Sequence, residues 1–129
     1  MAPSEPGWII IIDDEPDMLW ALENMLLKHG HVVRKADRAS EALSAMTKDQ
    51  FDIALLDAKL PDMEGLELAA KIKEINPTIS IIMISGYYYR DDDHMKKAMD
   101  SGLILNFVAK PFDHTLLLEL VESARTHSL

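Results

Sequence analysis

Carboxylates follow two short apolar runs of this sequence, and a serine and a lysine come at the ends of two others. Asp13 and Asp14 come after WIIII, and Asp57 comes after IALL. Ser85 comes after ISIIMI, and Lys110 lies two residues after ILNFV. Clustered carboxylates raise each other's pKa unless a cation joins them, and Mg²⁺ supplies two charges and accepts carboxylate and phosphoryl oxygens. The set predicts phosphoryl-transfer chemistry, with an acceptor carboxylate, a metal ion, and a lysine and a hydroxyl for the phosphoryl oxygens.

Each of these residues taken alone has a simpler explanation. Asp13 or Asp14 could cap a helix, and Ser85 could be an ordinary turn residue. Lys110 could be a solvated surface lysine, and Phe107, within an apolar run, could be a core residue. A helix cap does not account for carboxylates after two apolar runs together with a lysine after a third. The combination therefore favours a functional site.

Short apolar runs alternate with amphipathic stretches along the chain. This alternation predicts the strands and helices that must position these residues. The runs are continuous and rich in β-branched residues, as strands covered on both faces tend to be. Strands are expected at 8–12, 32–36, 53–56, 79–84 and 104–108. Helices are expected at 16–29, 40–48, 65–75, 92–101 and 114–126. Five βα units predict an α/β fold with a doubly wound, parallel five-stranded sheet, in which ligands bind beyond the carboxyl ends of the strands.

Proline and glycine support these boundaries. Pro16 suits the first turn of a helix, and Gly30 and Gly102 suit C-terminal caps. No internal repeat or low-complexity segment interrupts the alternation. We therefore expect one domain over residues 8–127, preceded by a flexible segment over residues 1–7.

The composition excludes several classes of function. The 129 residues suit a single domain, and 13 basic against 22 acidic residues give a formal charge of −9, which argues against direct binding to nucleic acid or to anionic membranes. The absence of cysteine excludes disulfides, thiol catalysis and cysteine–metal sites. Neither a signal peptide nor an apolar stretch near the roughly 18 residues of a membrane span is present, so a cytoplasmic protein is expected.

Four motifs occur in order at the expected strand ends: IIIIDDEPDML, IALLDAKLPDMEGLEL, IIMISGY and FVAKPF. From Trp8 to Arg125 the chain resembles a response-regulator receiver domain of two-component signal transduction, in the CheY-like superfamily. The resemblance implies a flavodoxin-like (βα)5 fold with strand order 2-1-3-4-5, an order for which CheY is itself a standard example. The string LWAL in the first expected helix is similar to receivers of the nitrogen-regulator type.

The resemblance implies a role for each residue of the acidic cluster. Asp57 is implied to accept a phosphoryl group from a phosphohistidine of a sensor histidine kinase or a phosphotransfer protein. Asp14, Asp57 and the backbone carbonyl of Lys59 are implied to bind Mg²⁺, and Asp13 to act through water. Glu15 lies beside this site but is not a ligand in the family pattern.

Further residues are implied to respond to the phosphoryl group. Ser85 is expected to contact it, and Lys110 is expected to pair with one of its oxygens. Phe107 occupies the position of an aromatic switch. Lys59 and Tyr87 occupy positions that tune the lifetime of the phosphoryl group in the family.

Surfaces for partners are expected on the first helix and around the last strand. Trp20 and Leu27 lie opposite the apolar face of the first helix and are predicted to dock the kinase. The fourth helix, fifth strand and fifth helix form the expected output face, for a homodimer or an effector domain. The chain between the serine and the lysine of the site is longer than in the family pattern, with the extra length around 87–93 and 103–106. We expect the segment 87–93 to move on phosphorylation. A cis peptide bond is expected at Lys110–Pro111.

Two other functions are left as alternatives. A pseudo-receiver would keep the fold and bind partners without accepting phosphate. An aspartyl-phosphate hydrolase would turn over a substrate, but its usual DxDx(T/V) nucleophile motif is absent. A signalling switch that assists its own phosphorylation and dephosphorylation, rather than a turnover enzyme, is therefore the leading hypothesis.

Overall fold

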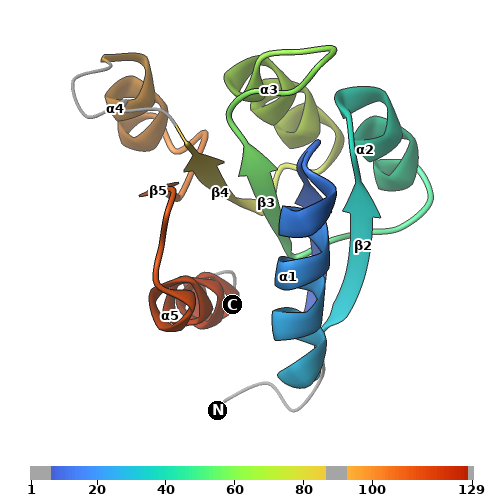
Figure 1. Cartoon of the computed structure of the whole chain (residues 1–129). Coiled ribbons are helices and arrows are strands. Elements are labelled where there is room, and N and C mark those ends of the chain that lie inside the picture. Colours follow the sequence, from blue (N-terminus) through green and yellow to red (C-terminus); the bar gives the residue numbers. More distant parts are fainter. Residues whose placement is uncertain (1–6, 87–92, 128–129) are drawn as a thin grey trace.

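The computed structural model describes residues 7–86 and 93–127, in which five parallel strands alternate with helices (Figure 1). The strands are β1 (Trp8–Ile12), β2 (Val32–Ala36), β3 (Ile53–Asp57), β4 (Ser80–Ser85) and β5 (Asn106–Ala109). The helices are α1 (Pro16–Lys28), α2 (Ala39–Met46), α3 (Gly65–Ile75), α4 (Asp93–Asp100) and α5 (His114–His127). The strand order β2-β1-β3-β4-β5 confirms the predicted doubly wound α/β fold.

Helices cover both faces of the sheet. α2, α3 and α4 lie on one face, and α1 and α5 lie on the other (Figure 1). Side chains alternate along each strand, so Ile10 and Ile12 join the core beneath α2, α3 and α4, whereas Ile9 and Ile11 join the core beneath α1 and α5. This two-sided burial is the reason that the central strands are continuous apolar runs. Among the described helices, none has the length and apolar character needed to cross a membrane.

The two edge strands differ from the predicted pattern. β2 exposes Arg34 and Lys35, because it lies at the edge of the sheet and the helices cover it incompletely. The expectation that every strand is covered on both faces is therefore wrong for β2. β5 begins at Asn106, later than predicted, because the N–H of Ile104 still donates to the carbonyl of Ala98 at the end of α4.

Three glycines shape the connections between these elements. Gly30 and Gly102 have φ angles of 82° just after α1 and α4, which confirms the predicted caps. Gly65 begins α3, and a Cβ atom there would lie 2.7 Å from the Cα atom of Ala58. Glycine at position 65 therefore allows α3 to start directly against the end of β3, beside Asp57.

The amino-terminal segment joins the fold at Gly7. This residue is buried, and its N–H donates to Nδ1 of His31 at 3.3 Å. The carbonyl of Gly7 accepts the N–H of Val32 at 2.8 Å. Residues 1–6 of the segment expected to be flexible lie outside the described residues.

Candidate functional site

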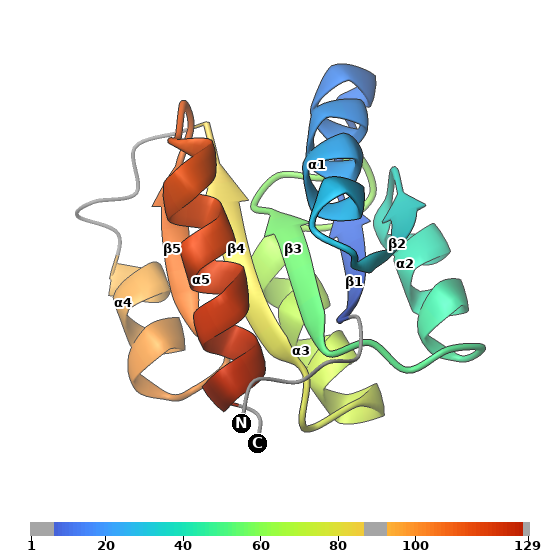
Figure 2. The ribbon, with the colours of Figure 1, turned by 90° about the horizontal axis from the view of Figure 1, so that it is seen from below.

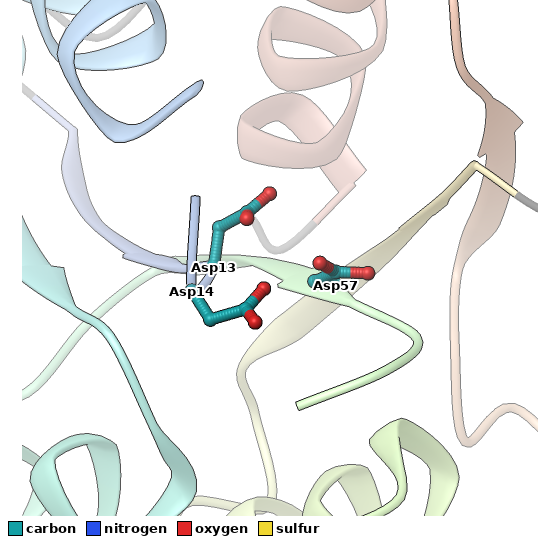
Figure 3. A group of neighbouring side chains, drawn as sticks. All are labelled: Asp13, Asp14 and Asp57. Atoms are coloured by element: carbon teal, nitrogen blue, oxygen red, sulfur yellow. The ribbon is translucent and has the colours of Figure 1, made fainter. Parts of the chain in front are cut away.

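Three carboxylates gather beyond the carboxyl ends of β1 and β3 (Figure 3). Asp13 and Asp14 follow β1, and Asp57 is the last residue of β3, the neighbouring strand. One carboxylate oxygen from each of the three residues lies within 4.8 Å of the others. Asp13 and Asp57 are buried, whereas Asp14 is exposed. The structure thus brings together the three carboxylates that the sequence predicted to form one site.

The ammonium group of Lys110 lies among these carboxylates. Its Nζ atom is 3.2 Å from Oδ2 of Asp13 and 3.7 Å from Oδ2 of Asp57. The backbone N–H of Lys110 donates to the carbonyl of Ser85 at 2.7 Å, which fixes the start of this loop against the end of β4. The Lys110–Pro111 peptide bond is cis, as predicted. The predicted lysine therefore belongs to the same cluster as the carboxylates.

Glu15 also contacts this ammonium group, although it was not among the predicted site residues. Its Oε1 atom is 3.2 Å from Nζ of Lys110, and its backbone N–H donates to Oδ1 of Asp13 at 2.9 Å. The side chain of Glu15 is 61% exposed, so water competes with this contact. The signal that could have identified it is the unbroken string DDE, which puts a third carboxylate in the turn after β1.

The cluster has three carboxylates and one ammonium group, and burial makes the charged form of its carboxylates costly. Burial raises the pKa of Asp57 to about 6, aided by the nearby charge of Asp13 and opposed by the hydrogen bond from the Lys59 N–H. Burial also raises the pKa of Asp13. Burial opposes the charge of Lys110, but the neighbouring carboxylates outweigh it and raise the pKa of Lys110. One ammonium group does not balance three carboxylates, so this set of oxygen donors fits a divalent cation such as Mg²⁺.

The loop that follows β3 is held by hydrogen bonds at two places, one at Asp57 and one at the N-terminus of α2. The N–H of Lys59 donates to Oδ1 of Asp57 at 3.1 Å. Further along the loop, the carboxylate of Asp62 accepts the N–H of Ala39 at 2.8 Å and that of Ser40 at 3.1 Å, and so caps the N-terminus of α2. Sequence reasoning missed this cap because donor and acceptor are 23 residues apart and no local pattern joins them. The bond ties the loop after Asp57 to α2.

The residues predicted to respond to a phosphoryl group extend from the site toward β5. Ser85 is buried at the end of β4, next to β5 in the sheet. Phe107 is half-buried, pairs with Met83 in the register of β4 and β5, and packs against the core beneath α2, α3 and α4. Tyr87 and the rest of the segment 87–92 lie outside the described residues.

The exposed face of α1 contains both residues predicted to dock a kinase. Trp20 is 67% exposed and Leu27 is 51% exposed. Leu22 and Leu26 are buried, so the predicted division of this helix into two faces is confirmed. Trp20 also borders a pocket of about 520 Å³ between α1 and His114 at the start of α5, but Leu27 does not line this pocket.

Comparison with known proteins agrees with this arrangement. Residues 9–122 match the family described as the response regulator receiver domain. The chain is 33% identical over 123 residues to the DNA-binding transcriptional regulator NtrC of Proteus hauseri, a match that covers 95% of this chain and 25% of NtrC. It is 32% identical over 105 residues to sporulation initiation phosphotransferase F of Bacillus subtilis (strain 168), a match that covers 81% of this chain and 82% of the relative.

A solved structure has the same fold over nearly the whole chain. The crystal structure of a CheY-like response regulator receiver domain protein from Methanospirillum hungatei JF-1 superposes with a TM-score of 0.88 at 30% identity. The match covers 96% of this chain and 97% of that chain.

The chain spans about a quarter of the length of NtrC and most of the length of phosphotransferase F. The family match includes the ends of β1, β3, β4 and β5, where the acidic cluster and its lysine lie. This chain belongs to the response regulator receiver domain family of two-component signalling proteins.

Proposed function

We propose that this domain, over residues 8–127, is a phosphoryl-accepting switch in which Asp57 takes the phosphoryl group from a phosphohistidine of a sensor histidine kinase or a phosphotransfer protein. The observation that supports this most directly is the burial of Asp57 beside Asp13, with the Lys110 ammonium 3.7 Å from its carboxylate. A carboxylate oxygen forms a bond to phosphorus, the bond from phosphorus to the imidazole nitrogen breaks, and the released imidazole takes up a proton. Membership of the receiver family and a relative named a phosphotransferase support the assignment.

The acidic cluster is proposed to hold Mg²⁺ during this transfer. Asp14, Asp57 and the backbone carbonyl of Lys59 would bind the ion directly, and Asp13 would act through a water molecule. When bound, the ion supplies positive charge that offsets both the carboxylates and the oxygens of the transferred group. The composition of the cluster supports this role, because three carboxylates lie within 4.8 Å of one another and Lys110 supplies a single positive charge. Burial, the main cause of the raised pKa values of Asp13 and Asp57, adds to the cost of ionising them without a cation.

Residues at the neighbouring strand ends are proposed to contact the new phosphoryl group and, by moving, to change the conformation of a surface that binds partners. Lys110 pairs with one phosphoryl oxygen, and the Ser85 hydroxyl donates to another. As Ser85 moves, Phe107 follows inward and alters the surface of α4, β5 and α5, where a homodimer partner or an effector domain binds. Lys59 and Tyr87, next to the site in sequence, tune the lifetime of the phosphoryl group.

Treatment with acetyl phosphate and Mg²⁺ is expected to add a single phosphate to the intact chain, as measured by mass spectrometry. Excess EDTA in place of Mg²⁺ should prevent the addition, because the incoming oxygens then meet uncompensated carboxylates. Release of inorganic phosphate is followed in the same samples. Absence of any adduct at every Mg²⁺ concentration would favour a pseudo-receiver, and release of many equivalents without an adduct would favour a hydrolase.

We further propose that Trp20 and Leu27 on α1 contact the kinase. Trp20→Ala is expected to slow phosphotransfer from the cognate kinase by about tenfold or more, because large exposed aromatic side chains dominate binding at many interfaces. Labelling by acetyl phosphate, which needs no docking, should be unchanged. Ile75→Ala is a matched control, since this apolar side chain is 46% exposed on α3, on the opposite face of the sheet. Normal transfer to Trp20→Ala, or equal slowing in both variants, would exclude the docking role.

A further inference from the structure

A second pocket lies at the opposite end of the sheet from Asp57. It has a volume of about 470 Å³ and is bounded by the end of α3, the start of β4, and the segment from the end of α4 to β5. In Figure 2 the arrowheads of the strands point toward the top, and α3 and α4 finish at the lower end. The residues that line this pocket lie near the starts of β4 and β5, whereas Asp57 is the last residue of β3. Its volume falls in the range of roughly 300–1,000 Å³ that is typical of small-molecule sites. The receiver chemistry described above does not use it.

The polar part of this pocket centres on the ammonium group of Lys73. This residue is in the last turn of α3 and donates to the carbonyl of Ile79. Lys73 is half-buried, and burial lowers the pKa of its amine. Among the described residues, no carboxylate lies within ion-pair distance of this amine, and no attractive charge acts on its pKa. Since an ammonium group has three donors, two are left for a ligand.

Hydroxyl groups and apolar side chains complete the walls. Thr78 and Ser80 line the pocket beside Lys73. Met99 at the end of α4, whose side chain is 43% exposed, and Leu105 just before β5 line it as well. The lining therefore combines one cationic group with apolar side chains from a different segment of the chain.

We propose that this pocket binds a small amphipathic monocarboxylate, with the carboxylate on the Lys73 ammonium and the apolar part against Met99 and Leu105. A monoanion is favoured over a phosphate or a nucleotide, because Lys73 is the one cationic residue among those described that line the pocket. A dianion would also meet the repulsion of a chain whose formal charge is −9. A cation or a neutral molecule would leave the half-buried ammonium group of Lys73 without a counter-charge.

The first test titrates the whole, ¹⁵N-labelled chain with 3-phenylpropionate and, in parallel, with the neutral 3-phenyl-1-propanol. We expect the carboxylate to shift the amide resonances of Thr78, Gly102 and Ile104 saturably, with a dissociation constant of roughly 1–5 mM for a molecule of this size. The alcohol has the same ring and chain and should bind at least about tenfold more weakly, because it lacks the charge. Equal affinity for the two compounds, or shifts that do not saturate, would overturn the proposal.

Variants at one residue then locate the carboxylate. Lys73→Gln keeps a donor for the carbonyl of Ile79 but removes the charge, and it should lose the preference for the carboxylate over the alcohol. Lys73→Arg should retain that preference. Lys71→Met is the matched control, since Lys71 is an exposed lysine on the same helix that does not line the pocket. An unchanged preference in Lys73→Gln, or an equal loss in Lys71→Met, would place the carboxylate elsewhere.

Discussion

Asp57→Asn is expected to reduce phosphate incorporation from acetyl phosphate and Mg²⁺ by roughly 1,000-fold or more, as nucleophile replacements commonly do. The amide of asparagine has nearly the shape of the carboxylate, and its oxygen can still accept the Lys59 N–H that Asp57 accepts at 3.1 Å. The fold of the loop should therefore persist while the charged nucleophile is lost. The effect is read as the fraction of chains with added phosphate in intact-mass spectra over time.

The control for this variant is Asp17→Asn. Asp17 is an exposed aspartate in the first turn of α1, so its replacement makes the same chemical change near the site but outside the acidic cluster. Incorporation in this control should equal that of the unaltered chain. If phosphate still adds to Asp57→Asn at an unreduced rate, another residue accepts it and the proposed acceptor is wrong.

Asp57→Asn is also expected to be more stable than the unaltered chain at neutral pH when Mg²⁺ is withheld. The pKa of Asp57 is raised from 3.8 to about 6, chiefly by burial. A tenfold change in an acid dissociation constant corresponds to about 1.4 kcal/mol, so ionising this carboxylate costs the folded state roughly 2–3 kcal/mol at about pH 7.5. Asparagine avoids that cost, so the free energy of unfolding of Asp57→Asn should exceed that of the unaltered chain by a similar amount.

The pH dependence of this difference has a definite sign. Between about pH 4 and pH 6 the folded chain binds more protons at Asp57 than the unfolded chain does, so the stability of the unaltered protein falls as the pH rises through this window. The gain in Asp57→Asn should therefore be near zero at about pH 3, rise between the two pKa values and be complete at about pH 7. Urea unfolding in EDTA at several pH values measures it. A gain that is constant across the window, or a loss at pH 7.5, would show that the charge of Asp57 is not destabilising.

The effect of Mg²⁺ on the free energy of unfolding tests whether the ion binds at the same site. A ligand that binds only the folded state stabilises it in proportion to the logarithm of its concentration. Millimolar Mg²⁺ should therefore stabilise the unaltered chain and have much less effect on Asp57→Asn, which lacks one of the proposed ligands. Equal stabilisation of both proteins would indicate that the ion binds outside the cluster.

Local sequence pattern was enough to predict the elements and the edge of the sheet where the site lies. The continuous runs WIIII and IALL become the central strands β1 and β3 because both faces of each strand are covered by helices. Parallel strands have their carboxyl ends at one edge, so the residues that follow them must lie near one another. For this reason Asp13, Asp57 and Lys110 could be grouped from the sequence alone. The two helix-capping glycines were predictable because a positive φ angle favours glycine wherever it occurs.

Contacts between distant segments could not be predicted in this way. Asp62 caps a helix that begins 23 residues earlier in the chain, and nothing in the spacing of either segment indicates that bond. The exposure of Lys35 depends on β2 being at the edge of the sheet, which is a property of strand order and not of the run itself. The pocket beside Lys73 exists because the ends of α3 and α4 meet the start of β4, although these segments are separate in sequence.

The sequence by itself determined which residue types are available at the site and which sheet edge they share, because strand and helix periodicity are local properties. The tertiary structure decided which of these side chains form ion pairs and how deeply each one is buried. Lys110 is shared by Asp13, Glu15 and Asp57, and that sharing depends on distances set by the packing of β1, β3 and β5. The raised pKa of Asp57 likewise depends on burial beneath neighbouring elements, because the cost of removing a charge from water is a property of the assembled fold.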